Sequence, residues 1–195
     1  MKPTFFLAVL LASASTSQAA IELQYSAGSG ALAYRKVHVA PAEVRFHRDF
    51  EATSGLRGLS HRLTPEESQR LARDMGESFR AALADALRAR GFELAAAPGA
   101  DVLQIRPALE DLYINAPDPA RAAPSRQYVR EAGQALLRAE GNDPSGKRLF
   151  VASEQRTTGR TEGLSRANEV SNRFWFDTMF RRYAEDLAAA LATTR

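Results

Sequence analysis

The sequence has no cysteine among its 195 residues. That absence excludes a disulfide framework, a thiolate metal site and a thiol nucleophile. It also excludes lipidation at an N-terminal cysteine, the residue through which a bacterial lipoprotein carries its lipid, so we expect no lipid anchor. The fold must therefore be held together by packing and hydrogen bonds alone.

Lysine is also scarce, and it occurs only at Lys2, Lys36 and Lys147. Arginine supplies nearly all of the positive charge, and 26 basic residues against 23 acidic residues leave a formal net charge of only +3. An excess this small attracts a phosphate backbone weakly, which argues against a nucleic-acid-binding protein. We expect no nucleic acid among the partners.

Long hydrophobic runs are missing after the first residues of the chain. Residues 1–19 have the pattern of a signal peptide, because Lys2 supplies an early positive charge, an apolar run follows, and Ser17-Gln18-Ala19 has the small residues of a cleavage site. The apolar run is shorter than the roughly 20 residues that cross a bilayer. We expect the mature chain to begin at Ala20 and to be periplasmic or secreted.

What remains after this segment has the size of one ordinary domain. Residues 20–33 include Gly28, Ser29 and Gly30, and we expect them to form a flexible leader. We expect residues 34–195 to form a single domain with its own hydrophobic core.

The first half of this domain predicts one strand and one helix. Alternating apolar residues over 35–46 indicate an edge-tolerant strand broken at Pro41, and residues 48–62 follow as a surface loop. Thr64-Pro65-Glu66-Glu67 has the pattern of a capping box with proline in the first turn, so a helix begins there. An apolar stripe continues this helix to Gly91, which suits a left-handed helix end.

The next segments alternate between strands and turns. Residues 92–96 predict a short strand. Residues 103–114 predict a longer strand whose apolar positions change parity, and a bulge at Glu110-Asp111 would return them all to one face. The three prolines within residues 115–125 exclude regular structure and predict a loop.

The last third of the chain completes a two-layer fold. Residues 127–139 and 147–157 flank a segment rich in turn formers, which predicts a hairpin. An apolar stripe predicts a long helix over residues 167–192. The whole order predicts an α+β fold, in which two long helices pack on one face of an antiparallel sheet to form a two-layer sandwich.

No motif indicates a catalytic, metal or cofactor site. Histidines occur at His38, His47 and His61, and their spacing does not match that of metal ligands. No Gly-x-Ser-x-Gly elbow is present to carry a serine nucleophile. The helix start explains the carboxylate pair Glu66-Glu67, and the bulge explains Glu110-Asp111. We predict no catalytic residue, no metal site and no cofactor.

The strongest functional signal is aromatic. Arg173 is followed by Phe174, Trp175 and Phe176, and one face of a helix cannot bury three consecutive aromatic residues. Phe176 belongs to the apolar stripe, while its two neighbours either pack beneath a loop or form an exposed patch with arginines. Tryptophan and arginine dominate interface hot spots. We therefore predict Trp175, Phe174, Arg173 and Arg182 as interaction residues.

Two other functions remain open at this point. The loops over residues 48–62 and 115–126 could together form the site of a small-ligand binder or a hydrolase. A group of arginines could instead bind an anionic surface with a strong salt dependence, although Glu154, Glu162 and Glu169 lie among them. These arginines are Arg156, Arg160, Arg166 and Arg173.

Five short segments carry a resemblance to a known family, and they are Val37 to Val44, Leu63 to Glu67, Arg90 to Glu93, Ala100 to Arg106 and Asp143 to Leu149. The chain resembles the uncharacterised small envelope proteins grouped as domain of unknown function thirty-three thirteen, many of them predicted lipoproteins. The resemblance implies an envelope location and no established activity. The missing cysteine distinguishes this chain from the lipidated members.

Together these features indicate a periplasmic, non-enzymatic interaction module of the cell envelope. Its partner would be another envelope protein or a cell-wall component, bound through a sheet edge or through the region of Trp175. Exposed sheet edges accept further strands, so a homodimer is a further expectation.

Overall fold

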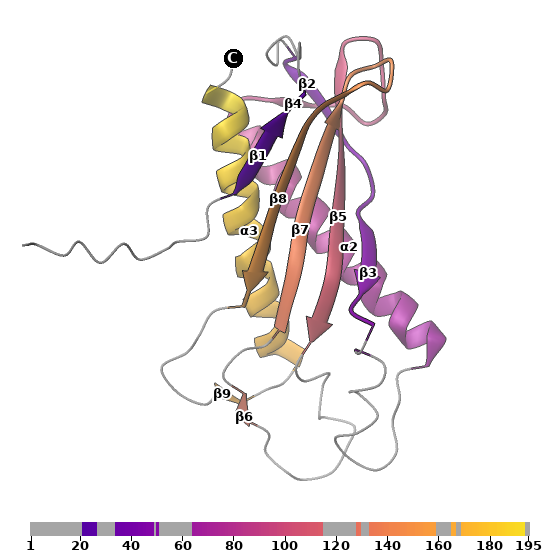
Figure 1. Cartoon of the computed structure of the whole chain (residues 1–195), viewed down its shortest axis with the longest axis vertical. Helices are drawn as coiled ribbons and strands as arrows, with labels where there is room; N and C mark the ends of the chain where they lie inside the picture. Colours follow the sequence, from indigo (N-terminus) through magenta and orange to yellow (C-terminus); the bar gives the residue numbers. More distant parts are fainter. Residues whose placement is uncertain are drawn as a thin grey trace, which may run out of the picture.

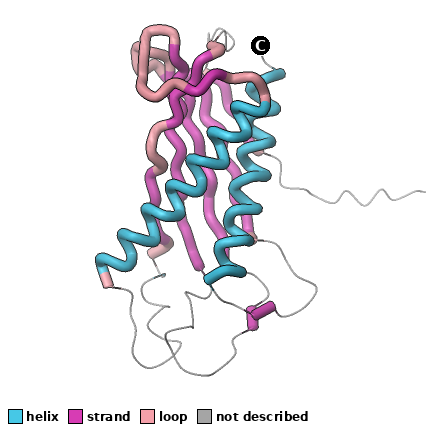
Figure 2. The backbone as a smooth tube through the Cα atoms, turned by 180° about the vertical axis from the view of Figure 1, so that it is seen from behind, coloured by secondary structure: helices cyan, strands magenta, loops and turns pink. Residues whose placement is uncertain are grey.

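A computed structural model describes residues 21–26, 34–48, 50, 64–114, 128–129, 133–158, 165–166 and 169–193. Figure 1 shows a sheet accompanied by two long helices, α2 (Pro65–Ala89) and α3 (Glu169–Thr193). Figure 2, which shows the molecule from behind, places both helices on the same face of that sheet. The predicted α+β fold, with two helices on one face of the sheet, is confirmed.

Seven strands form the main sheet. They pair in the order β1 (Glu22–Tyr25), β8 (Arg148–Thr157), β7 (Gly133–Asn142), β5 (Val102–Ile114), β2 (Lys36–Val39) and β4 (Glu93–Leu94), and β3 (Glu43–Phe46) also pairs with β5. The hairpin of β7 and β8 confirms a sequence prediction. Separately, the short strands β6 (Tyr128–Val129) and β9 (Ser165–Arg166) pair with each other.

The sheet is mixed, whereas the sequence analysis predicted an antiparallel one. Strands β5, β7, β8 and β1 run antiparallel, but β2 and β3 run parallel to β5, and β4 runs parallel to β2. The physical reason is α2, which returns the chain along the sheet between β3 and β4. A crossover of this length is what joins parallel neighbours.

Helix α2 begins and ends as predicted. The Thr64 hydroxyl accepts a hydrogen bond from the backbone N–H of Glu67 at 3.2 Å, and the Glu67 carboxylate accepts one from the backbone N–H of Thr64 at 2.9 Å. Pro65 fits the first turn because its missing N–H would have had no partner in the helix. Gly91 follows the helix with a φ of 81°, which glycine adopts without steric penalty.

The predicted bulge in β5 is also confirmed. The pairing of β5 with β7 shifts register between Glu110 and Tyr113, and Asp111 has a φ of 54°. The inserted residue turns Leu112 and Ile114 toward the helices, where 0% and 7% of their surfaces are exposed. The strand therefore presents apolar side chains to the helices over its whole length.

One strand occurs where none was expected. Residues 22–25 form the edge strand β1, although we assigned residues 20–33 to a flexible leader. This strand pairs antiparallel with β8, and Leu23 packs against the core. A four-residue strand is too short for its alternation to be recognised in the sequence, and only the exposed edge of β8 makes it form.

The segment after β1 differs from the prediction in two ways. The strand expected over residues 35–46 is two strands interrupted at Pro41, and β2 lies between β5 and β4 rather than at an edge. Phe50, which we assigned to the surface loop 48–62, has only 1% of its surface exposed and stacks on Phe46 with ring centroids 4.7 Å apart. The part of that loop after Phe50, and the loop 115–125, lie outside the described residues.

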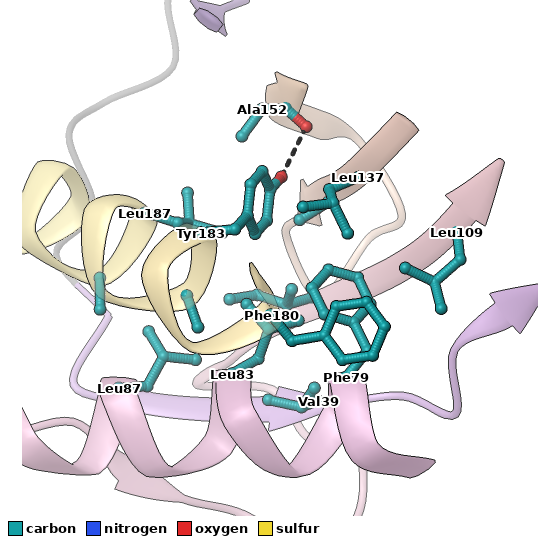
Figure 3. Close-up of a cluster of buried hydrophobic side chains, with 14 of the residues drawn as sticks. Val39, Phe79, Leu83, Leu87, Leu109, Leu137, Ala152, Phe180, Tyr183 and Leu187 are labelled. Atoms are coloured by element: carbon teal, nitrogen blue, oxygen red, sulfur yellow. Dashed lines mark hydrogen bonds between the residues drawn. The ribbon is translucent and has the colours of Figure 1, made fainter. Parts of the chain in front are cut away.

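The core lies between the helices and the sheet. Phe79 of α2 packs against Phe180 and Tyr183 of α3, with ring centroids 5.2 and 5.6 Å away. The Tyr183 hydroxyl donates a hydrogen bond to the backbone oxygen of Ala152 in β8 at 2.9 Å (Figure 3). Because the buried hydroxyl is hydrogen-bonded, the ring of Tyr183 is buried in the core without leaving an unsatisfied polar group.

Gly141 lies directly against the ring of its cross-strand partner Phe150. A Cβ atom at position 141 would be only 2.0 Å from that ring, so this position is sensitive to any added side chain. We predict that Gly141→Ala lowers the free energy of unfolding by about 1–3 kcal/mol, measured by urea denaturation. The double variant Gly141→Ala/Phe150→Leu should lose less than the sum of its single variants. Strict additivity would contradict this packing argument.

Candidate functional site

Three of the candidate interaction residues, Arg173, Phe174 and Trp175, lie near the beginning of α3, which is at the lower end of the sandwich in Figure 1. Phe174 is one of the two large hydrophobic residues that are exposed in the described part of the chain, with 57% of its surface accessible. Trp175 is half-buried, and Phe176 is 1% exposed within the core. The three consecutive aromatics are thus divided between core and surface, as the sequence predicted.

Phe174 and Trp175 form a contact of their own. Their ring centroids are 5.5 Å apart and the ring planes meet at 74°, which is the edge-to-face arrangement that aromatic pairs favour. The pair therefore presents a shared apolar surface at the start of the helix. Its role in binding stays a prediction.

Two arginines lie beside this pair and are held by local contacts. Arg173, whose side chain is 77% exposed, has its Nε 3.9 Å from Oδ2 of Asp177. Arg181 donates to the hydroxyl of Thr178 at 3.3 Å, and that hydroxyl donates to the backbone oxygen of Phe174 at 2.8 Å. These contacts turn the Arg181 guanidinium back toward the helix turn that carries Phe174.

Arg182 is exposed two helical turns after Trp175. Residues seven apart lie on nearly the same side of a helix, so Arg182 and Trp175 share one side of α3. We call the five residues Arg173, Phe174, Trp175, Arg181 and Arg182 the aromatic–arginine surface. Sequence analysis predicted four of them as interaction residues, and Arg181 was not among the four.

Asp177 connects this surface to the other helix. Its carboxylate accepts a hydrogen bond from the hydroxyl of Ser78 in α2 at 2.5 Å. A bond between two helices limits their sliding, so the beginning of α3 has a defined position against α2. The aromatic pair is therefore carried on a rigid element, as a recognition surface requires.

A buried charged cluster fixes α3 against β8. The side chain of Glu154 is 2% exposed and that of Arg156 is 14% exposed, and Nε of Arg156 lies 2.6 Å from Oε1 of Glu154. The two atoms are not aligned for a hydrogen bond, and Oε2 of Glu154 has no hydrogen-bond partner among the described residues. Arg156 also donates to Asp186 of α3 at 2.6 Å.

The electrostatics of this cluster favour the charged arginine. Burial acts to lower the pKa of Arg156, but the carboxylates of Glu154 and Asp186 outweigh it, so its pKa is raised above the ordinary value. Burial, with a smaller effect of the Glu154 charge, raises the pKa of Tyr183. Arg156 is thus an internal ion-pair partner, which corrects its inclusion among the surface arginines that could bind an anionic surface. Arg160 and Arg166 have no described side chains.

An open hollow with a volume of about 590 Å³ lies beside the bulge of β5. Arg45 and Glu110 form an ion pair at 2.5 Å along its wall, and the ring of His47 packs edge-on against Tyr113. Of its lining residues only Arg48 belongs to the loops 48–62 and 115–126, where we considered a small-ligand or hydrolase site, so that prediction stays untested. Its lining consists of Arg45, Phe46, His47, Arg48, Glu110, Asp111 and Leu136.

The histidines do not gather metal ligands in the described part of the chain. Nδ1 of His38 lies 3.1 Å from the backbone oxygen of Ala95, and His47 packs on an aromatic ring. No group of three or more histidine, cysteine, aspartate or glutamate residues that could hold a metal is found among the described residues. His61 lies outside them.

No helix in the described ranges has the length and hydropathy needed to cross a membrane. The family described as "Protein of unknown function (DUF3313)" matches residues 5–172 of the chain. No curated protein matches it.

Several solved structures share part of the chain's arrangement at low identity. A PelC dodecamer from Paraburkholderia phytofirmans is 17% identical with a TM-score of 0.44, covering 86% of this chain and 96% of that one. A DUF4136 family protein from Bacteroides thetaiotaomicron is 12% identical with a TM-score of 0.40, covering 86% and 98%. A minor lipoprotein from Acinetobacter baumannii is 11% identical with a TM-score of 0.35, covering 82% and 94%.

The structural role of Arg156 can be tested by removing its charge. We predict that Arg156→Met lowers the free energy of unfolding by about 3–5 kcal/mol, because Glu154 stays buried without a counter-charge. The double variant Glu154→Met/Arg156→Met should lose much less, since no buried charge remains. Both are measured by urea denaturation at neutral pH. A loss of less than about 1 kcal/mol in the single variant would contradict the buried-pair assignment.

Proposed function

The chain belongs to the DUF3313 family of proteins of unknown function, and we propose that it is a non-enzymatic interaction module of the cell envelope. The proposal is argued from the exposed residues of this chain. Its partner is another component of the envelope, contacted through the aromatic–arginine surface. The described residues of α3 support the proposed binding surface, and the N-terminal sequence supports the proposed location of the protein.

The observation that carries the proposal is the exposure of Phe174. The ring has 57% of its surface exposed and contacts the half-buried ring of Trp175, with arginines beside both. These residue types are the ones most often found at the energetic centre of interfaces. A helix held by Tyr183, Asp177 and Asp186 supports them rigidly.

The location rests on the first residues of the sequence. Residues 1–19 have the three parts of a cleavable signal peptide, and a chain without cysteine needs no oxidation to fold in any compartment. We therefore propose that the mature protein is periplasmic or secreted and carries no covalent lipid anchor.

The edge strand β1 is the alternative contact for the same function. It is paired on one side with β8 and ends the sheet, so its other side can accept a strand from a partner. The exposed Tyr25 lies in this strand, with 42% of its surface accessible. Pairing of two such edges would give a homodimer.

A small-ligand binder is the second candidate function, and the hollow beside the bulge favours it. Its wall combines cationic and anionic side chains, and Asp111 holds a left-handed backbone conformation that costs free energy for a residue other than glycine. The described lining also holds His47, Glu110 and Asp111, which can bind a polar ligand through hydrogen bonds.

The proposed function is tested by affinity capture from envelope extract with the chain from Ala20 onward. Phe174→Ser is the better variant, because it removes an exposed ring, whereas Trp175→Ala removes a half-buried one and can disturb the fold. We expect recovery of specific envelope components to fall about tenfold or more in Phe174→Ser, as for a hot-spot residue.

The matched control is Tyr25→Ser, which removes the other exposed aromatic from a different surface. It should leave the capture unchanged, and thermal unfolding should show that all variants are folded. Equal recovery by Phe174→Ser and the unmodified chain would contradict the proposal for α3. Loss confined to Tyr25→Ser would instead identify the β1 edge as the contact.

A further inference from the structure

We propose that the α-ammonium group of Ala20, which cleavage of the signal peptide creates, binds the buried carboxylate of Glu154 and so fixes the edge strand β1 against β8. The contact exists only in the mature chain, because in the precursor a peptide bond joins the nitrogen of Ala20 to Ala19. This inference rests on the cleavage site of the proposed function and gives the cleavage a role in completing the fold.

Glu154 has an unused hydrogen-bonding atom in a buried place. Its side chain is 2% exposed, and its Oε1 lies 2.6 Å from Nε of Arg156. Its Oε2 has no hydrogen-bond partner among the described residues. A buried carboxylate oxygen without a partner is unfavourable, so a donor that reaches this atom stabilises the folded state.

The charges around Glu154 are also one cation short. The cluster holds two carboxylates, Glu154 and Asp186, and one guanidinium, that of Arg156, which contacts both. Two negative charges and one positive charge leave a formal charge of −1. A group that brings both a donor and a positive charge therefore complements this cluster.

Two other arginines of these elements do not supply that charge. Arg138 is paired with Glu140, and it lies opposite Ser153, whose side chain points to the other face of the sheet from that of its neighbour in the cluster. Arg182 lies one turn before Asp186 on α3, but its side chain is exposed and no described ion pair joins it to the cluster. The described arginines thus leave the buried carboxylate oxygen without a cationic donor.

The register of β1 directs the mature N-terminus toward Glu154. Strand β1 runs antiparallel to β8 at the edge of the sheet (Figure 1), with Glu22 opposite Ser153. In the same register, position 21 falls opposite Glu154, and Ile21 is packed against the core. Opposite residues of antiparallel strands have Cα atoms only about 4.5–5.5 Å apart. A chain that begins at Ala20 therefore starts within reach of the Glu154 side chain.

Cleavage changes what the nitrogen of Ala20 can offer. In the precursor it is a peptide N–H, which provides one donor and no charge. In the mature chain it is an ammonium group with three donors, and charge-assisted hydrogen bonds are roughly twice as strong as neutral ones. The first end of a four-residue edge strand is thus held only after the signal peptide has been removed.

The amino group can be observed directly, because Lys36 and Lys147 carry the only other amines of the mature chain. Reductive methylation with 13C-formaldehyde labels these three groups, and dimethylated amines keep their charge. Their NMR signals can be titrated separately. The chain is prepared with Ala20 as its first residue, and it contains every described element.

We expect the amino group of Ala20 to have a pKa about one unit higher in the folded chain than in the same chain unfolded in urea, because a nearby carboxylate favours the charged form. At pH 7 the unlabelled chain should have a folding equilibrium constant about tenfold larger than that of a chain extended by Gly-Ser before Ala20. The extension moves the ammonium roughly 7 Å along the strand. The difference should be present below the unfolded pKa and be lost as the pH rises through the folded pKa.

Other titrating groups at this position do not imitate that pH dependence. Carboxylates titrate several units lower, arginine stays charged, and burial raises the pKa of the tyrosine further above the range of the titration. The charged and titratable groups that face the N-terminus from the elements packed there are Glu22 on β1, Glu154 and Arg156 on β8, and Asp186 and Tyr183 on α3.

Glu154→Gln should return the pKa of the Ala20 amino group to its unfolded value. The matched control is Glu22→Gln, which removes an exposed carboxylate from β1 itself and should leave the pKa raised. An equally raised pKa in Glu154→Gln, or a loss of the shift in Glu22→Gln, would contradict Glu154 as the partner. The Gly-Ser comparison alters no residue of the cluster, so equal stability of the two chains overturns the proposal even if Glu154→Gln does not fold.

The outcome is separable from that of the proposed function. Capture through the aromatic–arginine surface is measured with Phe174→Ser and does not depend on the pKa of the amino group. An unshifted pKa together with a loss of capture in Phe174→Ser means that the N-terminal contact is wrong and the interaction module stands. A shifted pKa with capture unaffected by Phe174→Ser means the reverse.

Discussion

The whole architecture depends on β5 keeping one apolar face over 13 residues. It pairs with β7 on one side and with β2 and β3 on the other, and the remaining strands of the main sheet join it through one or two intervening strands. The apolar positions of β5 change parity after Leu109, which without a correction would turn Leu112 and Ile114 to the opposite face. The bulge at Asp111 returns both residues to the core, and aspartate tolerates the left-handed conformation better than a branched residue would.

Helix α3 packs on the same side of the sheet, over β8 and β7, and leaves its other side exposed. Phe180 and Tyr183 pack on the core, and the bond from Arg156 to Asp186 attaches the same helix to β8. A helix fixed at several points along its length can expose an aromatic ring at its beginning without losing stability overall. The exposed Phe174 is consequently a feature of a rigid element, and it is this rigidity that makes a binding role physically reasonable.

Whether a sequence prediction was correct depended on how far apart along the chain the interacting residues lie. The capping box at Thr64 and the bulge at Glu110-Asp111 were predicted correctly, because each depends on a few adjacent residues. The antiparallel sheet was wrong in β2, β3 and β4, because strand direction depends on where α2 returns the chain. Arg156 was misassigned to the surface, because one of its partners is Glu154, two residues earlier on the strand, and the other is Asp186 on helix α3.

The sequence by itself determined the α+β class, the limits of α2, the bulge and the impossibility of burying Phe174, Trp175 and Phe176 together. These properties follow from local backbone preferences and from the periodicities of helix and strand, which act over a few residues. Only the tertiary structure decided that β1 completes the sheet, that Phe50 is buried and that Arg156 is enclosed while Arg181 and Arg182 face water. These outcomes depend on which distant segments of the chain pack together in the folded protein, because those contacts decide which residues are buried.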